Sequence, residues 1–345
     1  MGCSLLYLST VDRITETLTG ALSTDNRAWI GFAAIACGFM VLRFCGQGML
    51  TMVSRNMLMK WFDHKRGLAS GIMGTMVALT FSSTPFFFDK VIEHLGWKNS
   101  WLLMGGLALG GICLFIAVFF RDNPEACGLQ PDGGREPKPD DPRHDPDHDY
   151  TLAQARRTPQ FWIFNLTIAL HALYFTAFTF HVVSIFEQAG IGKSKAFAVF
   201  IPASVLAVGA RIFCGWLSDH VRLVALLLVL MSGMAVSMLG LVLLSTGAGY
   251  YMIIIGNGAA GAVFGLLASI TWPRFFGRTH LGAISGFHMA WTVAFSAFGP
   301  LAFGLSLEHL DSYVTATAGC LALLAVLFLC SLKWCMSGPE VSGTA

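Results

Sequence analysis

Long apolar runs separated by short polar segments fill most of the chain. A helix that crosses a bilayer needs about 20 mostly apolar residues. Nine runs meet this requirement and are too many for buried helices of a soluble protein, which would lack an amphipathic surface. The pattern therefore predicts an all-α membrane protein with nine transmembrane helices, at 28–55, 67–88, 98–120, 159–186, 196–217, 222–245, 249–273, 281–307 and 312–335.

The composition agrees with this prediction and excludes several functions. Charged residues make up 12% of the 345 residues, whereas soluble domains carry about 25%. The net charge of +2 and the absence of a basic patch predict no nucleic-acid partner. Nine scattered cysteines without a CxxC pair, and the lack of a nucleophile elbow or phosphate-binding loop, predict no cofactor and no enzyme.

One polar segment, 121–158, interrupts the apolar pattern and is predicted to be a mobile loop. His144 and His148 lie among aspartates in it and could hold a metal, although a solvated linker is the favoured interpretation. If this loop is cytoplasmic, fourteen Lys and Arg residues lie on its side of the membrane and six on the other. This bias predicts an integral protein of the plasma membrane, a bacterial inner membrane, with a cytoplasmic C-terminus.

The sequence repeats at an offset of 215 residues. Gly71 matches Gly286, Pro85 matches Pro300, and the tripeptide at 93–95 matches that at 308–310. Parallel repeats of this kind occur in transporters and predict two pseudo-symmetric halves. We expect an N-terminal half at 1–120, a loop at 121–158 and a six-helix C-terminal half at 159–345.

The repeat also predicts which helices have no counterpart. The helix at 222–245 should have a mate near 7–30, yet residues 10–28 are polar. We therefore expect the chain to begin near the end of the third of twelve helices, so that 1–120 holds the end of helix 3 and helices 4–6. A late start of the gene model, a broken gene and a genuine nine-helix protein are the alternatives.

The loop GWLSDHVR at 215–222 resembles the second copy of the signature loop of the major facilitator superfamily. Gly215 and Asp219 match its glycine and acid, Arg222 stands for its basic end, and the late glycine is absent. The resemblance implies a loop that locks the inward gate through charge contacts. Asp219 is expected to cap the following helix and to meet a basic partner. A plain cap that fixes topology is the alternative.

Other segments resemble one branch of that superfamily. Arg43 begins RFCGQG, which is similar to the family's fourth-helix motif. KWFDHKRGLASG (60–71), RDNPEACGLQPDG (121–133) and TLAQARRTPQFW (151–162) are similar to oxalate/formate antiporters and monocarboxylate transporters. Arg211 in ARIFCGWLSD resembles the Arg-x-x-x-Gly pattern that binds carboxylate there. The stretch 287–300 lacks the lysine of oxalate carriers, which disfavours a dicarboxylate held by two cations.

The charges inside the predicted spans favour an anionic substrate. Arg43 and Arg211 lie in spans whose middles contain no Asp or Glu. An arginine at such a depth costs about 2.5–3.5 kcal/mol, so it normally faces the bundle interior or water. Its guanidinium fork matches a carboxylate. Pairing with acids of absent helices, or reaching the interface, is the alternative for each.

Polar and aromatic residues also mark one face of the span at 159–186. Spacings of four and three residues place them together, and this face is predicted to border the central cavity. His171 and His181 are candidate proton carriers, because histidine changes charge near neutral pH. His288 is a similar case on the eleventh helix, and interhelical hydrogen bonding is the alternative for all. The members of the face are Thr167, His171, Tyr174, Phe178 and His181.

Together these features predict a secondary active transporter that works by alternating access. Its expected substrate is a small organic anion, with a monocarboxylate favoured, and its expected driving force is proton symport or anion exchange. A multidrug or other efflux carrier is one alternative. A non-transporting remnant, or a membrane sensor on a transporter scaffold, is the other.

Overall fold

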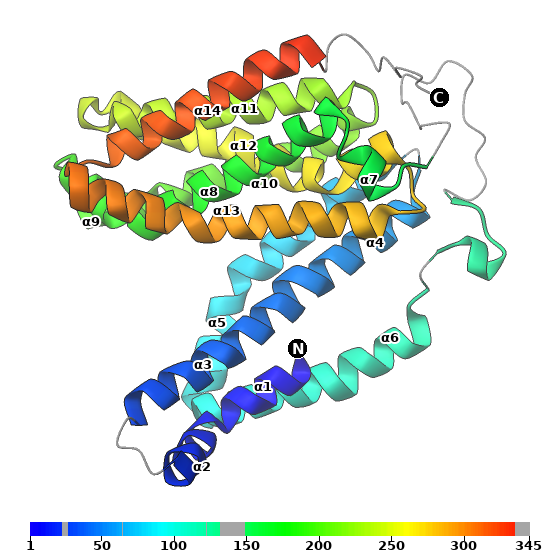
Figure 1. The fold of residues 1–345 in the computed structure, drawn as a ribbon, viewed down its shortest axis with the longest axis vertical. Helices are drawn as coiled ribbons and strands as arrows, with labels where there is room; N and C mark the ends of the chain where they lie inside the picture. The colour runs from blue at the N-terminus through cyan, green and yellow to red at the C-terminus, as the bar shows by residue number, and fades with distance from the viewer. Residues whose placement is uncertain (23–26, 64, 122, 132–148, 335–345) are drawn as a thin grey trace. The chain divides into compact units, whose positions relative to one another are not determined.

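The computed structural model describes residues 1–22, 27–63, 65–121, 123–131 and 149–334, and within these ranges it contains helices and no strands (Figure 1). The predicted all-α class is confirmed. Eight helical stretches of the described residues are long and apolar enough to cross a membrane: Ala28–Trp61, Lys90–Phe119, Pro159–Gln188, Lys193–Ser218, Leu223–Val242, Ala248–Phe276, Leu281–Leu310 and Tyr313–Trp334.

The ninth predicted span, 67–88, lies in the first part of α5 (Arg66–Gly106). Several of its side chains, including that of Pro85, lie outside the described residues. Most of the predicted loop, with His144 and His148, is outside them as well. The described flanks of that loop are a short turn, η3 (Glu125–Cys127), and the helix α7 (Leu152–Ala155), which a Thr151–Gln154 capping box begins.

The chain forms two compact units. Unit 1 consists of Met1–Met57 and Val77–Gln130, and unit 2 consists of Leu58–Met76 and Pro131–Ala345. Unit 2 therefore takes in the end of α4 and the start of α5, both from the N-terminal part of the chain. The predicted division at 121–158 remains a prediction.

Unit 1 is built from short and long helices with many exposed apolar side chains. Tyr7 in α1 donates its hydroxyl to the Ala34 carbonyl of α3 at 3.2 Å. Trp29, Phe32 and Met40 are 72%, 66% and 72% exposed, as expected of side chains that face lipid. The elements are α1 (Gly2–Ser9), α2 (Val11–Leu22), α3 (Arg27–Arg43), the π-helix η1 (Phe44–Leu50), most of α4 (Thr51–Trp61), the later part of α5, the π-helix η2 (Leu107–Ile112), α6 (Cys113–Phe119) and η3.

Unit 2 is a bundle in which α8, α11 and α12 form the interior. An aromatic cluster joins the start of α8 to the end of α12. The ring centroid of Phe161 lies 5.3 Å from that of Trp272 and 5.8 Å from that of Phe276. Its further elements are α7, α8 (Pro159–Gln188), α9 (Lys193–Ala198), α10 (Phe200–Ser218), α11 (Leu223–Val242), η5 (Leu244–Thr246), α12 (Ala248–Phe276), α13 (Leu281–Leu310) and α14 (Tyr313–Trp334).

Glycines bring α11 and α12 into backbone contact. A Cβ atom on Gly256 would lie 2.4 Å from the Ser237 nitrogen and 2.6 Å from the Gly233 oxygen. A Cβ on Gly249 would lie 2.3 Å from the Gly240 oxygen. Small residues are the usual means by which membrane helices pack closely, because no hydrophobic effect drives their association.

The predicted repeat recurs in the backbone. α5 begins at Arg66 and is interrupted at Gly96, whose φ is 72°. α13 begins at Leu281 and ends before Asp311, whose φ is 49°. Both pairs are 215 residues apart (281 − 66 and 311 − 96). The two helices thus begin, and are interrupted or end, at positions that are 215 residues apart.

Candidate functional site

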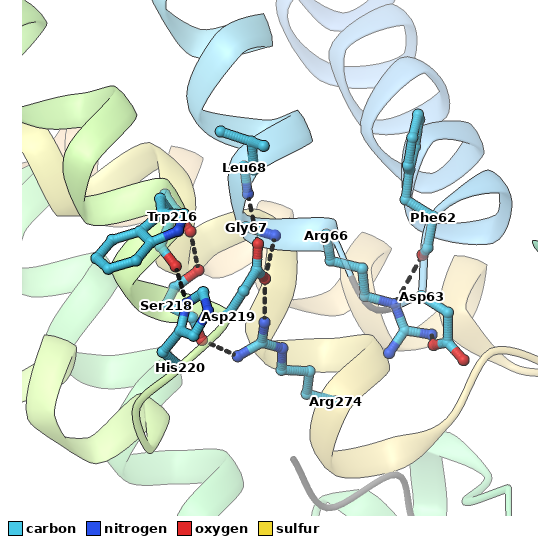
Figure 2. Close-up of polar contacts among 11 residues, drawn as sticks. Phe62, Asp63, Arg66, Gly67, Leu68, Trp216, Ser218, Asp219, His220 and Arg274 are labelled. Atoms are coloured by element: carbon cyan, nitrogen blue, oxygen red, sulfur yellow. Dashed lines mark hydrogen bonds and ion pairs between the residues drawn. The ribbon is translucent and has the colours of Figure 1, made fainter. Parts of the chain in front are cut away.

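The signature-like loop follows α10 and places an acidic side chain at the start of α5. α10 ends at Ser218, whose hydroxyl donates to the Gly215 carbonyl at 2.7 Å. The chain then turns, with the His220 N–H donating to the Leu217 carbonyl at 2.9 Å. This turn points the carboxylate of Asp219 toward the N-terminus of α5 (Figure 2).

The carboxylate of Asp219 caps α5 and pairs with an arginine. Its Oδ1 accepts from the Gly67 N–H at 2.8 Å, and its Oδ2 accepts from the Leu68 N–H at 2.9 Å. Arg274, near the end of α12, forms an ion pair with Oδ1 at 2.7 Å and donates to the Ser218 carbonyl at 2.6 Å. The two N–H groups would otherwise lack helical partners, and the positive end of the helix dipole favours the anion.

Both charged side chains of this contact are buried, each with 7% of its surface exposed. A buried charge is tolerated when it is paired and hydrogen-bonded. Asp219 and Arg274 meet that condition because each satisfies the other and both also bind backbone groups. We call this arrangement the joint; it holds α10 and α12 to the start of α5.

Two glycines make the joint possible. A Cβ atom on Gly67 would lie 1.7 Å from the Ser218 Oγ and 2.3 Å from the Gly215 oxygen. A Cβ on Gly215 would lie 2.6 Å from the Gly67 oxygen. The helices α5 and α10 therefore cross with their backbones in contact, which only residues without a side chain allow.

The structure corrects one expectation for the signature loop. Asp219 caps α5 and not the following helix: α11 starts at Leu223, and no side chain caps it at its N-cap residue, Arg222. Arg222 is exposed and has no contact with Asp219 among the described residues. The basic partner is Arg274, which lies 55 residues away, and sequence spacing gave no signal for it.

Arg211 lies on α10 two turns before the joint and binds only neutral groups. Its guanidinium donates to the Gly74 carbonyl of α5 at 2.6 Å and to the Gly261 carbonyl of α12 at 3.1 Å. It is half-buried and has no carboxylate partner among the described residues. A bidentate anion would satisfy such a guanidinium better than two carbonyls do.

The predicted polar face of α8 is mostly packed inside unit 2. Tyr174 is 1% exposed, and its hydroxyl shares a 3.0 Å hydrogen bond with Ser237, which in turn donates to Asn257 at 2.9 Å. Thr167 is buried and bonds its own helix, and Phe178 is buried as well. Interhelical hydrogen bonding, the alternative expectation, is thus observed for Tyr174, whereas Thr167 bonds within α8.

The histidines of the site differ in their surroundings. His171 stacks between Phe175 and Phe264, with ring centroids 5.8 and 4.5 Å away, and its buried Nδ1 has no partner among the described residues. His288 is 3% exposed and contacts the Asn165 Oδ1 through Nδ1 at 2.8 Å, and its ring is tilted against that of Trp272 with the centroids 4.6 Å apart.

Arg43 and His181 complete the predicted set. Arg43 is exposed and belongs to unit 1, where it ends α3 and precedes η1. The glycine motif after it, Gly46 and Gly48, is therefore π-helical, a form that often marks functional positions. His181 is half-buried and bonds α13 and α14 through both ring nitrogens.

A second acidic anchor lies in unit 2 outside the spans. Asp149 accepts from the Thr279 hydroxyl and from the backbone N–H groups of Thr279 and Arg278, just before α13. The hydroxyl bond is the largest contribution, and together these bonds hold the pKa of Asp149 below its ordinary value. The start of α13 is thus anchored to the segment that leads into α7.

These observations define an integral membrane protein in which a buried ion pair caps one helix and an arginine of a candidate span, Arg211, binds two backbone carbonyls. A sequence model of the Major Facilitator Superfamily matches residues 18–300, so the chain belongs to that superfamily.

Two curated proteins are similar to parts of the chain. The uncharacterized major-facilitator-type transporter YhjX of Escherichia coli (strain K12) is 26% identical over 210 residues, which is 60% of this chain and 48% of that protein. The probable sulfoacetate transporter SauU of Cupriavidus necator is 29% identical over 99 residues, 28% of this chain and 23% of that protein. The chain thus covers less than half the length of either relative.

Proposed function

We propose that this protein is a secondary active carrier of a small organic anion, with a monocarboxylate as its favoured substrate. Alternating access would carry the anion across the membrane, driven by proton symport or by exchange for another anion. The chain's membership in the Major Facilitator Superfamily and the names of both relatives as transporters support the general activity. The observation that carries the choice of an anion is the environment of Arg211.

Arg211 keeps a positive charge inside a span without an acid to neutralise it among the described residues. A guanidinium stays protonated in proteins, so its charge persists wherever the helix places it. An arriving carboxylate would exchange two neutral acceptors, the carbonyls of Gly74 and Gly261, for two charge-assisted bonds. We therefore propose Arg211 as the principal ligand of the substrate carboxylate.

The bond from Arg211 to the Gly74 carbonyl would also connect the proposed substrate site to the joint at Asp219. Gly74 lies two turns after Gly67 on α5, and Arg211 lies two turns before Asp219 on α10. A carboxylate that draws Arg211 away from the Gly74 carbonyl loosens one of the contacts between α5 and α10. Substrate binding would thereby favour opening of the joint, which alternating access requires.

The resemblances of sequence support the same proposal. Motifs at 60–71, 121–133 and 151–162 resemble the oxalate/formate and monocarboxylate branch, and the absence of a second cation at 287–300 favours one carboxylate over two. SauU is named for sulfoacetate, a small organic anion, which agrees with an anionic cargo. Arg43, His171 and His288 stay predictions as further ligands.

An efflux carrier is the main alternative. A carrier of cationic drugs is expected to hold a buried acid in its spans, and Asp219, the buried acid described here, is already paired with Arg274. A remnant or sensor without transport is the other alternative. Both predict that no organic acid is taken up.

The test is uptake into proteoliposomes of purified, folded protein. Labelled lactate, formate, oxalate and sulfoacetate are supplied under an imposed pH gradient, and wild type is compared with Arg211→Gln. Two charged hydrogen bonds contribute about 3–6 kcal/mol, so the variant should bind its substrate at least about 100-fold more weakly. Arg222→Gln, which alters an exposed arginine eleven residues on, is the matched control and should transport normally.

Either outcome is informative. Uptake of one acid that disappears in Arg211→Gln and persists in Arg222→Gln supports an anion carrier with Arg211 in its site. A folded wild type that takes up none of the four acids refutes the anion proposal and favours efflux or a non-transporting role.

A further inference from the structure

His181 joins three helices at the end of unit 2 opposite to Asp219. It lies 22 residues after Pro159, the first residue of α8, which corresponds to about 33 Å along the helix. Its Nε2 lies 3.0 Å from the Pro300 carbonyl oxygen of α13, and its Nδ1 lies 3.2 Å from the Tyr313 hydroxyl of α14. That hydroxyl also donates to the Ser184 Oγ of α8 at 3.0 Å.

The partners fix the hydrogen positions on the ring. A carbonyl oxygen only accepts, so Nε2 must carry the proton that it donates to Pro300. In the neutral imidazole Nδ1 is then an acceptor, and the Tyr313 hydroxyl can donate to it only by giving up its bond to the Ser184 Oγ.

The charged imidazole is satisfied by the same atoms. When a proton from water adds to the lone pair of Nδ1, this nitrogen becomes a donor to the Tyr313 oxygen. The Tyr313 hydroxyl then donates to the Ser184 Oγ, which is the direction that the structure has. The observed network therefore satisfies the charged ring without movement of any heavy atom.

We propose that His181 is the proton-binding site that couples a proton to transport. The inference rests on the proposed carrier function and specifies its coupling ion and the group that binds it. The proton enters and leaves at Nδ1, and no covalent bond between heavy atoms changes. The bound charge strengthens the bond to the Pro300 carbonyl, because charge-assisted hydrogen bonds are about twice as strong as neutral ones.

The position of Pro300 gives this bond mechanical importance. Proline has no N–H to donate, so α13 lacks one internal hydrogen bond at this turn and can bend there. One turn earlier, the Thr176 and Ser296 hydroxyls share a 3.0 Å hydrogen bond, and a Cβ on Gly299 would lie 2.3 Å from the Leu173 oxygen. A protonated His181 thus holds α13 to α8 more tightly where α13 can bend, and loss of the proton weakens that bond.

Other ionisable groups near this end do not take part. Tyr250 of α12 packs on Phe186, and α11 contains no titratable side chain. In the described part of the chain no carboxylate contacts the imidazole, so the proton's charge is shared with Tyr313 and the carbonyl alone. The remaining charged or titratable residues at this end of α8, α9 and α13 are exposed and do not contact His181: Glu187, Lys193, Lys195, Glu308, His309 and Asp311.

A transport experiment tests the proposal with one substitution. In His181→Gln the amide can donate to Pro300 and accept from Tyr313, so the variant imitates the neutral ring and cannot bind a proton. We expect it to retain exchange of labelled for unlabelled substrate without a gradient, while stimulation of uptake by an acidic exterior falls to about onefold. His309→Gln, an exposed histidine nearby, is the control and should keep the stimulation of wild type. Undiminished stimulation in His181→Gln, or wild-type uptake that ignores the pH gradient, would overturn the proposal.

A second measurement does not depend on transport and separates failure of this inference from failure of the carrier function. The ring C–H signals of isotope-labelled histidine are recorded by NMR between pH 5 and 8, and the His181 signal is assigned by its loss in His181→Gln. We expect the signal to report proton binding, and we expect Tyr313→Phe to lower the proton affinity of His181 about tenfold, because the tyrosine oxygen accepts from the charged form. A His181 signal that does not titrate refutes proton binding even if the protein transports an acid.

Discussion

Removing the carboxylate of Asp219 should open the joint between α5, α10 and α12. In Asp219→Ala the N–H groups of Gly67 and Leu68 lose their acceptor, and the Arg274 charge stays buried without its anion. Breaking a buried ion pair from one side costs about 3–5 kcal/mol. The penalty applies to the closed joint only, because water can solvate Arg274 once the helices separate. The ratio of closed to open joint should therefore fall by about 100- to 4,000-fold.

Distances between spin labels measure this ratio directly. In a background without the native cysteines, labels on Lys65→Cys and His220→Cys, two exposed positions that flank the joint, report its opening by pulsed electron paramagnetic resonance. Wild type should give one short distance, and Asp219→Ala should give a longer and broader distribution. Asp219→Asn, which keeps an acceptor but loses the charge, should lie between them.

A matched control separates this effect from a general loss of charge. Asp12→Asn breaks an ion pair with Lys98 in which both side chains are 51% exposed. Exposed pairs contribute about 0–1 kcal/mol, so the label distances should not change. A single short distance in Asp219→Ala would refute the assignment of Asp219 as the group that holds the joint closed.

Two further predictions concern stability. Gly256→Leu should lower the midpoint of thermal unfolding, because its Cβ would meet the backbone of α11 and overpacking costs about 1–3 kcal/mol. Gly265→Leu is the control and should not lower the midpoint, because open space surrounds its Cβ. Equal shifts in the two variants would contradict the close packing of α11 and α12. Asp149→Asn should destabilise the protein at pH 7. Because folding lowers the pKa of Asp149, its carboxylate adds stability at pH values above its unfolded-state pKa of about 3.9. This stability is lost as the pH falls through the pKa of the folded state. Unfolding scans from pH 3 to 7 should show the difference from wild type shrinking in acid, and a difference independent of pH would contradict this origin.

Much of the fold was predictable because a bilayer imposes a length and a polarity on every span. The apolar runs from residue 159 onward match the observed helices closely, and the 215-residue repeat anticipated that α5 and α13 are equivalent. What the pattern did not reveal is that Gly96 and Asp311 adopt positive φ at the same place in each repeat. Hydropathy does not report backbone dihedrals, and only one of the two residues is a glycine.

The site was predictable only where its residues form a local motif. Asp219, Gly215 and Arg211 stand within nine residues of one another and matched a pattern, whereas Arg274 did not. Gly67 and Leu68 bind the Asp219 carboxylate through their backbone N–H groups, and such groups are present whatever the side chain. Asp219 reaches them across 152 and 151 residues, and such pairings depend on tertiary packing.

Buried hydrogen-bond partners were hidden for a similar reason. The spacing of the α8 residues predicted a shared face, and the structure agrees, but periodicity does not say what the face touches. Tyr174 meets Ser237 from α11, and His181 meets Tyr313 from α14, whose apolar sequence gave no signal of this role.

The inclusion of Leu58–Met76 in unit 2 has a consequence for how the protein is made. The start of α5 leaves the ribosome early, but its acceptor Asp219 follows 152 residues later and Arg274 a further 55 residues after that. At about 5–20 residues per second, the N-terminus of α5 waits roughly 10–40 s for both partners. Until then its unpaired N–H groups must bind water, lipid headgroups or the insertion machinery. The six C-terminal helices produced alone would carry the acid and the base of the joint but not the helix end that they close on, so co-expression with residues 1–130 should be needed to restore it.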